Sequence, residues 1–397
     1  MMDELFPRGP RADFAARSFN EPLYDFLNRS GDPFIEDIRR LIAGWLSHMP
    51  SMHIADLQCR LQSKDDAEFE SAFWELYLHE AYRRSGYSLT IHPAAAGTTR
   101  HPDFLVLGNG TRFYLEAVRA CASSSSAGEN KRLEDARRVL ATLRADRYML
   151  DMATYAIGTP PLKVKVLRRD LREWLADLNR KANRHPAGTG SRTLHRLPWH
   201  QEDGWRLEFT AQLLRPEHIG TGLPLIRAHL AMGWGHDAVR ILAALDEKAN
   251  KYGPLEAPLV IAVLSNTQFR TEDIDVERVL FGALTGRPSP QHPEAHQMLE
   301  PGHWCTGKGW RRPHAPQVIT VHDLYPWTIS QAQPRLWTTL QPGVAAPAQP
   351  GWLAVMQVSG TMPTPTAADS VADLFDLPPD WPAREPHFIT QSRTVPL

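Results

Sequence analysis

The sequence predicts an α/β protein in which a mixed sheet is flanked by helices. Amphipathic helical patterns recur along the chain, and short β-prone runs lie between them. The hydrophobic content of 42% and the charged content of 22% are ordinary for a globular protein. With 397 residues the chain is long enough to bury a sizeable core, either as two domains or as one elaborated domain.

The first part of the chain is expected to be helical. Residues 1–30 show weak periodicity and are expected to wrap the surface. Residues 33–48 place apolar side chains at helical spacing, and a stronger helix is expected from about Asp66 to Ser85. Gly86 stands where the C-terminal end of that helix is expected.

After Gly86 the pattern changes from helix to strand. Short β-prone runs occur at 87–92, 103–107 and 112–118. The last two runs are joined by Gly108-Asn109-Gly110, a strong signal for a tight hairpin turn. The sequence therefore predicts an antiparallel pair of strands at this point.

Helices and strands then alternate to about residue 285, and proline recurs from about Arg287 onward. The expected elements are a helix at 129–147, a strand at 148–156, a helix at 171–181, strands at 205–214 and 258–264, helices at 237–252 and 274–284, and β-prone runs at 317–321 and 352–358. The tail after about Pro363 is expected to be poorly ordered. The expected organisation is an N-terminal helical extension (1–60), a core with insertions (61–285) and a Pro-rich accessory region (286–397).

Composition narrows the classes of function. The three cysteines, Cys59, Cys121 and Cys305, are widely spaced, which argues against a disulfide framework and favours a reducing cytoplasm. No apolar run is long enough to cross a membrane, and the acidic, polar N-terminus has no pattern of a signal peptide. The net charge is −1, but residues 131–196 hold 16 Lys and Arg against 7 Asp and Glu. This basic segment is either a phosphate-contacting face or a set of solvated helices.

Three acidic residues stand in an order that suits metal chemistry. Glu75 lies on the helix that ends at Gly86, Asp103 opens the first strand of the hairpin, and Glu116 lies near the end of the second. An antiparallel pairing brings Asp103 and Glu116 together. Two adjacent carboxylates repel each other, and Mg²⁺ or Mn²⁺ between them removes that cost.

This pattern resembles the PD-(D/E)xK nuclease superfamily, whose restriction-endonuclease-like fold is a mixed sheet flanked by helices. The resemblance covers about residues 66–120. Glu75 stands eleven residues before Gly86, and Glu116 stands thirteen residues after Asp103, as is typical of resolvases in that superfamily. The resemblance implies a Mg²⁺- or Mn²⁺-dependent endonuclease that acts on DNA. Asp103 and Glu116 would then be metal ligands, and Glu75 would bind a second metal or orient the attacking water.

The chain departs from the family pattern two residues after the strand acid. The family has lysine there, whereas this chain has Val118, and Arg119 points to the opposite face of the strand. The family tolerates a lysine supplied from a neighbouring helix, so Lys131 and Lys248 are the candidates for the missing group. The carbonyl of Ala117 is expected as a further metal ligand.

Other polar residues have simpler explanations. Glu80 falls within an apolar helical stripe and is expected to meet an N–H or Arg partner in the core, with a place at the site as the alternative. Residues 123–126 are expected to be a connecting loop. His303, Cys305 and His314 fit no zinc spacing and are interpreted as loop residues. The side chains of three tryptophans are interpreted as core residues, namely Trp74, Trp205 and Trp234.

Two alternatives to a nuclease stay open. The first is a protein with the same fold and no catalysis, which binds nucleic acid or a protein partner. The second is a scaffold in which the three acids are surface residues. DNA is the expected partner, no membrane contact is expected, protein partners are undetermined, and a homodimer remains open.

Overall fold

The computed structural model describes most of the chain and divides it into two compact units. The described residues are 4–15, 17, 21–95, 99–120, 143, 147–156, 158–184, 194–202, 204–213, 226–229, 236–266, 272–284, 298–306, 308–358, 362–378 and 381. Unit 1 comprises residues 1–16, 21–121 and 237–385, and unit 2 comprises 17–20, 122–236 and 386–397.

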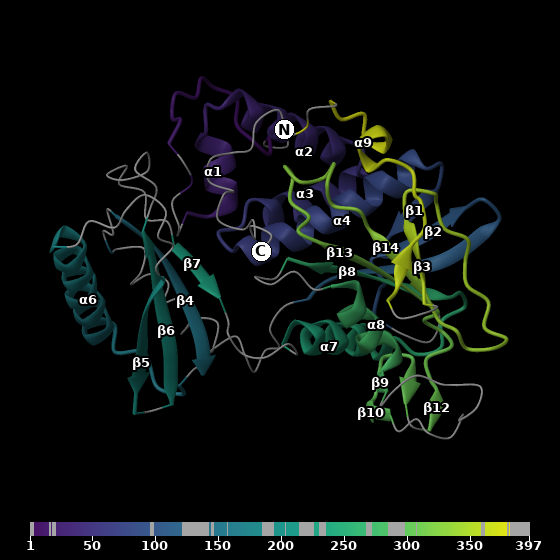
Figure 1. Ribbon diagram of the computed structural model, residues 1–397. Coiled ribbons are helices and arrows are strands. Elements are labelled where there is room, and N and C mark those ends of the chain that lie inside the picture. The colour runs from purple at the N-terminus through teal and green to yellow at the C-terminus, as the bar shows by residue number, and fades with distance from the viewer. Residues whose placement is uncertain are drawn as a thin grey trace. The chain divides into compact units, whose positions relative to one another are not determined.

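Unit 1 contains an eight-stranded sheet and its covering helices (Figure 1). Its helices are α1 (Leu23–Arg29), α2 (Pro33–Ser47), α3 (Ser51–Leu61), α4 (Asp66–Arg84), α7 (His236–Lys251), α8 (Asp273–Phe281) and α9 (Val371–Leu374). The strands of the sheet are β1 (Ser88–Ile91), β2 (Phe104–Gly108), β3 (Thr111–Arg119), β8 (Leu259–Ser265), β13 (Gln317–His322), β14 (Arg335–Thr338), β15 (Ala354–Gln357) and β16 (Thr364–Pro365). Two small pairs are β9 (Ala283–Leu284) with β10 (Met298–Glu300) and β11 (Cys305–Thr306) with β12 (Gly309–Trp310).

The large sheet is mixed, which confirms the expected α/β class. Its order is β1-β2-β3-β8-β13-β14-β15-β16, with β1, β2 and β3 antiparallel and β3, β8 and β13 parallel. Every residue of the central strand β8 is buried. Burial on both faces explains why this segment reads as one continuous apolar run.

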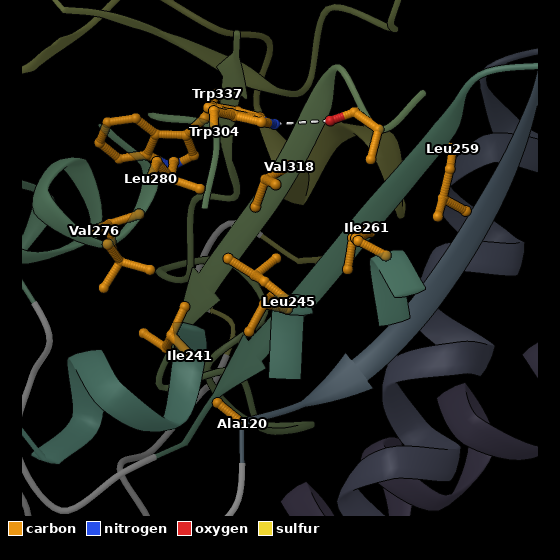
Figure 2. Packing of buried hydrophobic residues seen from close by; sticks show 14 of the residues in the cluster. Ala120, Ile241, Leu245, Leu259, Ile261, Val276, Leu280, Trp304, Val318 and Trp337 are labelled. Atoms are coloured by element: carbon orange, nitrogen blue, oxygen red, sulfur yellow. Dashed lines mark hydrogen bonds between the residues drawn. The ribbon is translucent and has the colours of Figure 1, made fainter. Parts of the chain in front are cut away.

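Helices cover both faces of the sheet (Figure 1). On one face α4 packs against β3, and its Trp74 indole N–H donates to the Ala262 carbonyl at 3.0 Å. On the other face Ile241 and Leu245 of α7 and Leu280 of α8 point toward the sheet in one buried cluster (Figure 2). The sheet is therefore the shared core of unit 1.

The hairpin between β2 and β3 forms as predicted. Gly108 pairs with Thr111, so the loop consists of Asn109 and Gly110. Their φ angles are 50° and 72°, which the twist of a two-residue hairpin requires and which Asn and Gly adopt readily. Turn chemistry thus sets the register of every residue pair along the two strands.

Several expectations about the ends of unit 1 were wrong. Residues 1–30 do not simply wrap the surface, because α1 buries Leu23, Phe26 and Leu27. The part of the tail from Thr364 to Leu374 contains β16 and α9, and the ring centroids of Phe375 and Trp45 lie 4.6 Å apart with the planes tilted by 36°, whereas residues 382–397 lie outside the described residues. The helix α3 was also not predicted, since its apolar stripe is weak.

The structure divides the chain differently from the expected boundaries 61–285 and 286–397. Strands β13 to β16 come from the Pro-rich region, yet they complete the same sheet as the hairpin. The backbone of β13 pairs with β8 over six residues, so this region is part of the core. Residues 122–236, expected within the core, form most of unit 2.

Unit 2 contains a four-stranded sheet and a basic helix. Its elements are β4 (Tyr148–Ala156), α6 (Val164–Arg184), β5 (Leu194–Gln201), β6 (Trp205–Leu213) and β7 (Ile226–His229). The strand order is β5-β6-β4-β7, and Leu167 and Leu171 of α6 share a buried cluster with Trp205. Basic side chains on the exposed part of α6 are Lys165, Arg169, Arg172, Arg180 and Lys181.

Some expectations cannot be compared with the structure. The loop 123–126, Lys131 and most of the helix expected at 129–147 lie outside the described residues, as does Trp234. Among the described residues, no helix combines the length and apolar character that a bilayer crossing requires. Trp74 and Trp205 are buried, as expected of core residues.

Replacement of Gly110 tests the dependence on the hairpin turn. We expect Gly110→Ala to lower the free energy of unfolding by about 1–2 kcal/mol, because an L side chain at positive φ is strained. Gly44→Ala is the matched control, since Gly44 lies inside α2 with nothing within 4 Å of an added Cβ. That change should be neutral or stabilise by up to about 1 kcal/mol. Urea unfolding of both variants measures the difference, and equal effects would contradict the prediction.

Candidate functional site

Asp103 and Glu116 lie directly across the β2–β3 hairpin. The register pairs Phe104 with Leu115, so the next pair consists of the two acids. The Asp103 N–H donates to Glu116 Oε2 at 3.2 Å, and the Ala117 N–H donates to Asp103 Oδ2 at 2.7 Å. Each carboxylate is held by the backbone of the opposite strand, and the two acids converge as the hairpin pattern indicated.

Three side chains near the end of α7 surround Glu116, which is fully buried. The ammonium groups of Lys248 and Lys251 donate to Oε1 at 2.7 and 2.8 Å, and the Tyr252 hydroxyl donates to Oε2 at 2.6 Å. Lys248 was among the sequence candidates, whereas Lys251 and Tyr252 were missed. Their spacing of three and four residues from Lys248 places them on the same helix face, which is the signal that was available.

The side chains on the two faces of β3 explain why the cations that contact Glu116 come from helix α7. Val118 is half-buried and packs in the cluster beneath α7, on the same face as Glu116. Arg119 points the other way, as expected, and its Nε donates to Glu70 Oε2 on α4 at 2.6 Å. A cation that reaches Glu116 must therefore come from the α7 face.

Glu75 lies near this pair and does not bond to it. Arg60 of α3 holds the Glu75 carboxylate with two hydrogen bonds of 2.7 and 2.5 Å. Glu75 and Asp103 line the same small open pocket, whose cavity volume of about 20 Å³ is enough for about one water molecule. The residues around this pocket are Met49, His53, Asp56, Leu57, Arg60, Glu75, Ile91, His92, Asp103 and Phe104.

The electrostatic environment separates the two hairpin acids. Burial raises the pKa of Asp103 to about 7, and the charges of Glu116 and Glu75 add to the increase. Burial also acts to raise the pKa of Glu116, but the ammonium of Lys248 and the other donors outweigh it and hold that pKa below its usual value. Near neutral pH, Glu116 is therefore charged while Asp103 is at its titration point.

Glu80 is a structural acid, as the sequence indicated. Its side chain is fully buried and accepts hydrogen bonds from Arg83 at 2.8 Å, from Arg84 at 2.6 Å and from His48 at 3.0 Å. Burial opposes ionisation, yet these donors lower the pKa of Glu80 to about 2. The carboxylate is thus satisfied within its own helix and by α2.

The His and Cys residues of the C-terminal region make separate contacts within unit 1. His303 Nδ1 contacts Asp246 Oδ1 at 2.9 Å, and His314 Nε2 contacts the Ala249 carbonyl at 3.0 Å. Cys305 lies in β11. The expectation that all three are loop residues was wrong for Cys305, which lies in a strand.

The acids fit a hard divalent cation in chemical type. Carboxylate oxygens are the ligands that Mg²⁺ and Mn²⁺ prefer, and Asp103 faces a pocket. However, Lys248, Lys251 and Arg60 already neutralise the charges of Glu116 and Glu75. Within the described part of the chain, no three Asp, Glu, His or Cys side chains are arranged to hold a metal ion as they stand. A cation would have to replace at least one of these ammonium or guanidinium groups.

The raised pKa of Asp103 predicts a pH-dependent effect of Asp103→Asn on stability. The folded chain keeps a proton on Asp103 up to about pH 7, whereas an unfolded Asp loses it near pH 3.9, so stability falls as pH rises between these values. Asparagine does not titrate, so the Asp103→Asn variant does not lose this stability as the pH rises. We expect a gain of about 1–3 kcal/mol near pH 8 and little gain near pH 4, measured by urea unfolding with a chelator present.

The control for this experiment is Asp37→Asn, which changes an exposed acid paired with Arg40 on α2. It should not stabilise the protein more at high pH than at low pH. A gain from Asp103→Asn that is the same at every pH would contradict the titration of this carboxyl.

Removal of Glu116 tests how far the buried ion pairs depend on it. Glu116→Gln leaves Lys248 and Lys251 facing a neutral group, so we expect a loss of about 3 kcal/mol in the free energy of unfolding. Glu256 is the matched control, because it pairs with Arg112 at 3.3 Å on the surface and both side chains are about half exposed. Glu256→Gln should change stability by less than about 1 kcal/mol. Equal losses would show that burial of the pair has no energetic consequence.

Comparison with known proteins adds no relative to this description. No protein-family model, no curated protein and no solved structure matches the chain. A function for this chain therefore has to be inferred from its own side chains and their geometry.

Proposed function

We propose that this chain is a divalent-cation-dependent nuclease that hydrolyses phosphodiester bonds in DNA. The observation that carries the proposal is the pair Asp103 and Glu116, joined across the hairpin, with Lys248 at 2.7 Å from Glu116. Two acids and a lysine at one point resemble the chemistry of the PD-(D/E)xK superfamily. The mixed sheet with helices on both faces supports a restriction-endonuclease-like fold.

The roles of the side chains follow from their charges. Asp103 and Glu116 would hold Mg²⁺ or Mn²⁺, with Glu75 at a second ion or at the attacking water. The ion would lower the pKa of a water molecule and stabilise the charge that develops on the phosphate. Lys248 supplies a positive charge from α7 where the family has a strand lysine. Its buried ammonium stays protonated, because the attraction of Glu116 raises its pKa against the opposing effect of burial.

The rest of the chain supports a polyanionic substrate. The exposed basic residues of α6 belong to the segment 131–196, which we propose contacts the DNA backbone. Lysine and arginine contacts of this kind bind phosphates without reading the base sequence. The proposal is therefore a nuclease whose affinity for DNA falls as salt rises.

The test is cleavage of plasmid DNA by the purified full-length chain with Mg²⁺ or Mn²⁺. We expect Asp103→Asn to abolish cleavage and Lys248→Ala to reduce the rate by about 100-fold, since it removes a charge at the transition state. Glu256→Gln, which alters an acid outside the pocket, should cleave as the unmodified chain does. Circular dichroism establishes that each variant is folded. Cleavage that persists in folded Asp103→Asn would refute the assignment.

A second candidate function is a nuclease-like protein that binds nucleic acid or a partner without cutting. The observation that favours it is the saturation of Glu116, whose two oxygens accept four hydrogen bonds from within the chain. Calorimetry with Mg²⁺ and Mn²⁺ separates the two functions. Salt-dependent DNA binding without metal binding would support the second candidate and exclude the first.

A further inference from the structure

Three cationic side chains neutralise the acids of the candidate site, and they hold them in different ways. Arg60 donates one hydrogen bond to each oxygen of Glu75, the two-bond geometry in which a guanidinium binds a carboxylate most firmly. Lys248 and Lys251 each donate one hydrogen bond to Glu116, and both bonds end on Oε1. A divalent cation that binds these acids has to take the place of one of the three, so their surroundings determine which one leaves most easily.

Lys248 is the more enclosed of the two lysines. It lies about one turn before the C-terminal end of α7, and 17% of its side chain is exposed. The carboxylates of Glu116 and Asp103 both attract its ammonium, which therefore lies in the field of the two hairpin acids at once. Release of this ammonium into water would lose both attractions, so we expect Lys248 to stay in place.

Lys251 is held less firmly, and it lies where its side chain can move. It is the last residue of α7, and 27% of its side chain is exposed. Besides its bond of 2.8 Å to Glu116, its ammonium lies 5.1 Å from the centroid of the Tyr252 ring, a weak cation–π contact. The Lys251 carbonyl accepts a hydrogen bond of 3.0 Å from Arg100, which holds the backbone. The flexible lysine stem can therefore carry the ammonium into solvent while the helix end stays where it is.

We propose that Lys251 holds the place of the divalent cation at Glu116 and moves into solvent when the cation binds, whereas Lys248 and Arg60 stay. This inference rests on the proposed function and names the residue that sets the cation concentration at which the site fills. The exchange also changes the charge of the site. The double charge of the cation, together with Lys248 and Arg60, exceeds the charge of the three carboxylates by one, so the filled site attracts a phosphate.

The first measurement is the binding of Mn²⁺ to the full-length chain by electron paramagnetic resonance, which requires no cleavage. We expect Lys251→Met to bind Mn²⁺ about 10- to 100-fold more tightly than the unmodified chain, the range that corresponds to one hydrogen bond to a charged group. Lys251→Arg keeps the positive charge and should bind Mn²⁺ no more tightly than the unmodified chain. Lys64→Met is the matched control, because Lys64 is largely exposed and pairs with Asp25 outside the site, and it should leave the affinity unchanged.

The second measurement uses the unmodified chain, so it does not depend on the folding of any variant. The lysines are acetylated briefly with and without Mg²⁺, and mass spectrometry gives the extent of reaction at each residue. We expect Lys251 to react faster with Mg²⁺, because its amine is then in solvent, while Lys248 stays protected and Lys64 reacts at the same rate in both conditions. A lysine with a purely structural role would not respond to the cation.

The outcomes distinguish this inference from the function on which it rests. If the unmodified chain binds Mn²⁺ but folded Lys251→Met binds it no more tightly, or if Lys251 stays protected with Mg²⁺, the inference is overturned and the nuclease remains. If neither the unmodified chain nor folded Lys251→Met binds Mn²⁺, both proposals fail. If only Lys251→Met binds Mn²⁺, the inference stands, and the unmodified chain is not a cation-dependent nuclease.

Discussion

The site in unit 1 depends on the burial of one carboxylate, Glu116, in the middle of a sheet. An ionised acid without solvent costs several kcal/mol unless charged and hydrogen-bonding partners surround it. Lys248, Lys251 and Tyr252 supply those partners from α7, and the Asp103 N–H supplies another from β2. The hairpin turn, the strand register and the approach of α7 are therefore all linked to this single group.

The two acids of the hairpin have different environments although they face each other. Glu116 is turned toward the cations of α7, which hold it ionised, whereas Asp103 lines the pocket together with Glu75. The charges of Asp103, Glu116 and Glu75 are matched in number by Lys248, Lys251 and Arg60. Under the proposed function, a divalent cation would have to compete with these ammonium and guanidinium groups for the same oxygens.

Local sequence signals were sufficient for the elements nearest the site. The Gly108-Asn109-Gly110 turn predicted the hairpin, and two-residue alternation put Arg119 on the opposite face from Glu116. The helix ending near Gly86 was also predicted, because its apolar spacing and its end signal agree. Strands β13 and β15 of the Pro-rich region were expected, whereas elements with weak local signals were missed, such as α3, which supplies Arg60, and strands β14 and β16 of the Pro-rich region. Their stability comes from packing against distant segments, which no local pattern records.

The sequence by itself determined the α/β class, the hairpin and the opposition of Asp103 to Glu116, since these depend on turn chemistry and on the two-residue period of a strand. Only the tertiary structure decided that Lys248, more than 130 residues away, reaches Glu116, and that Lys251 and Tyr252 join it. It also decided that Arg60 neutralises Glu75 and that His53 and His92 share a pocket with Asp103. The physical reason is that long-range contacts follow from how helices pack on the two faces of the sheet, and many different side chains satisfy the same local pattern.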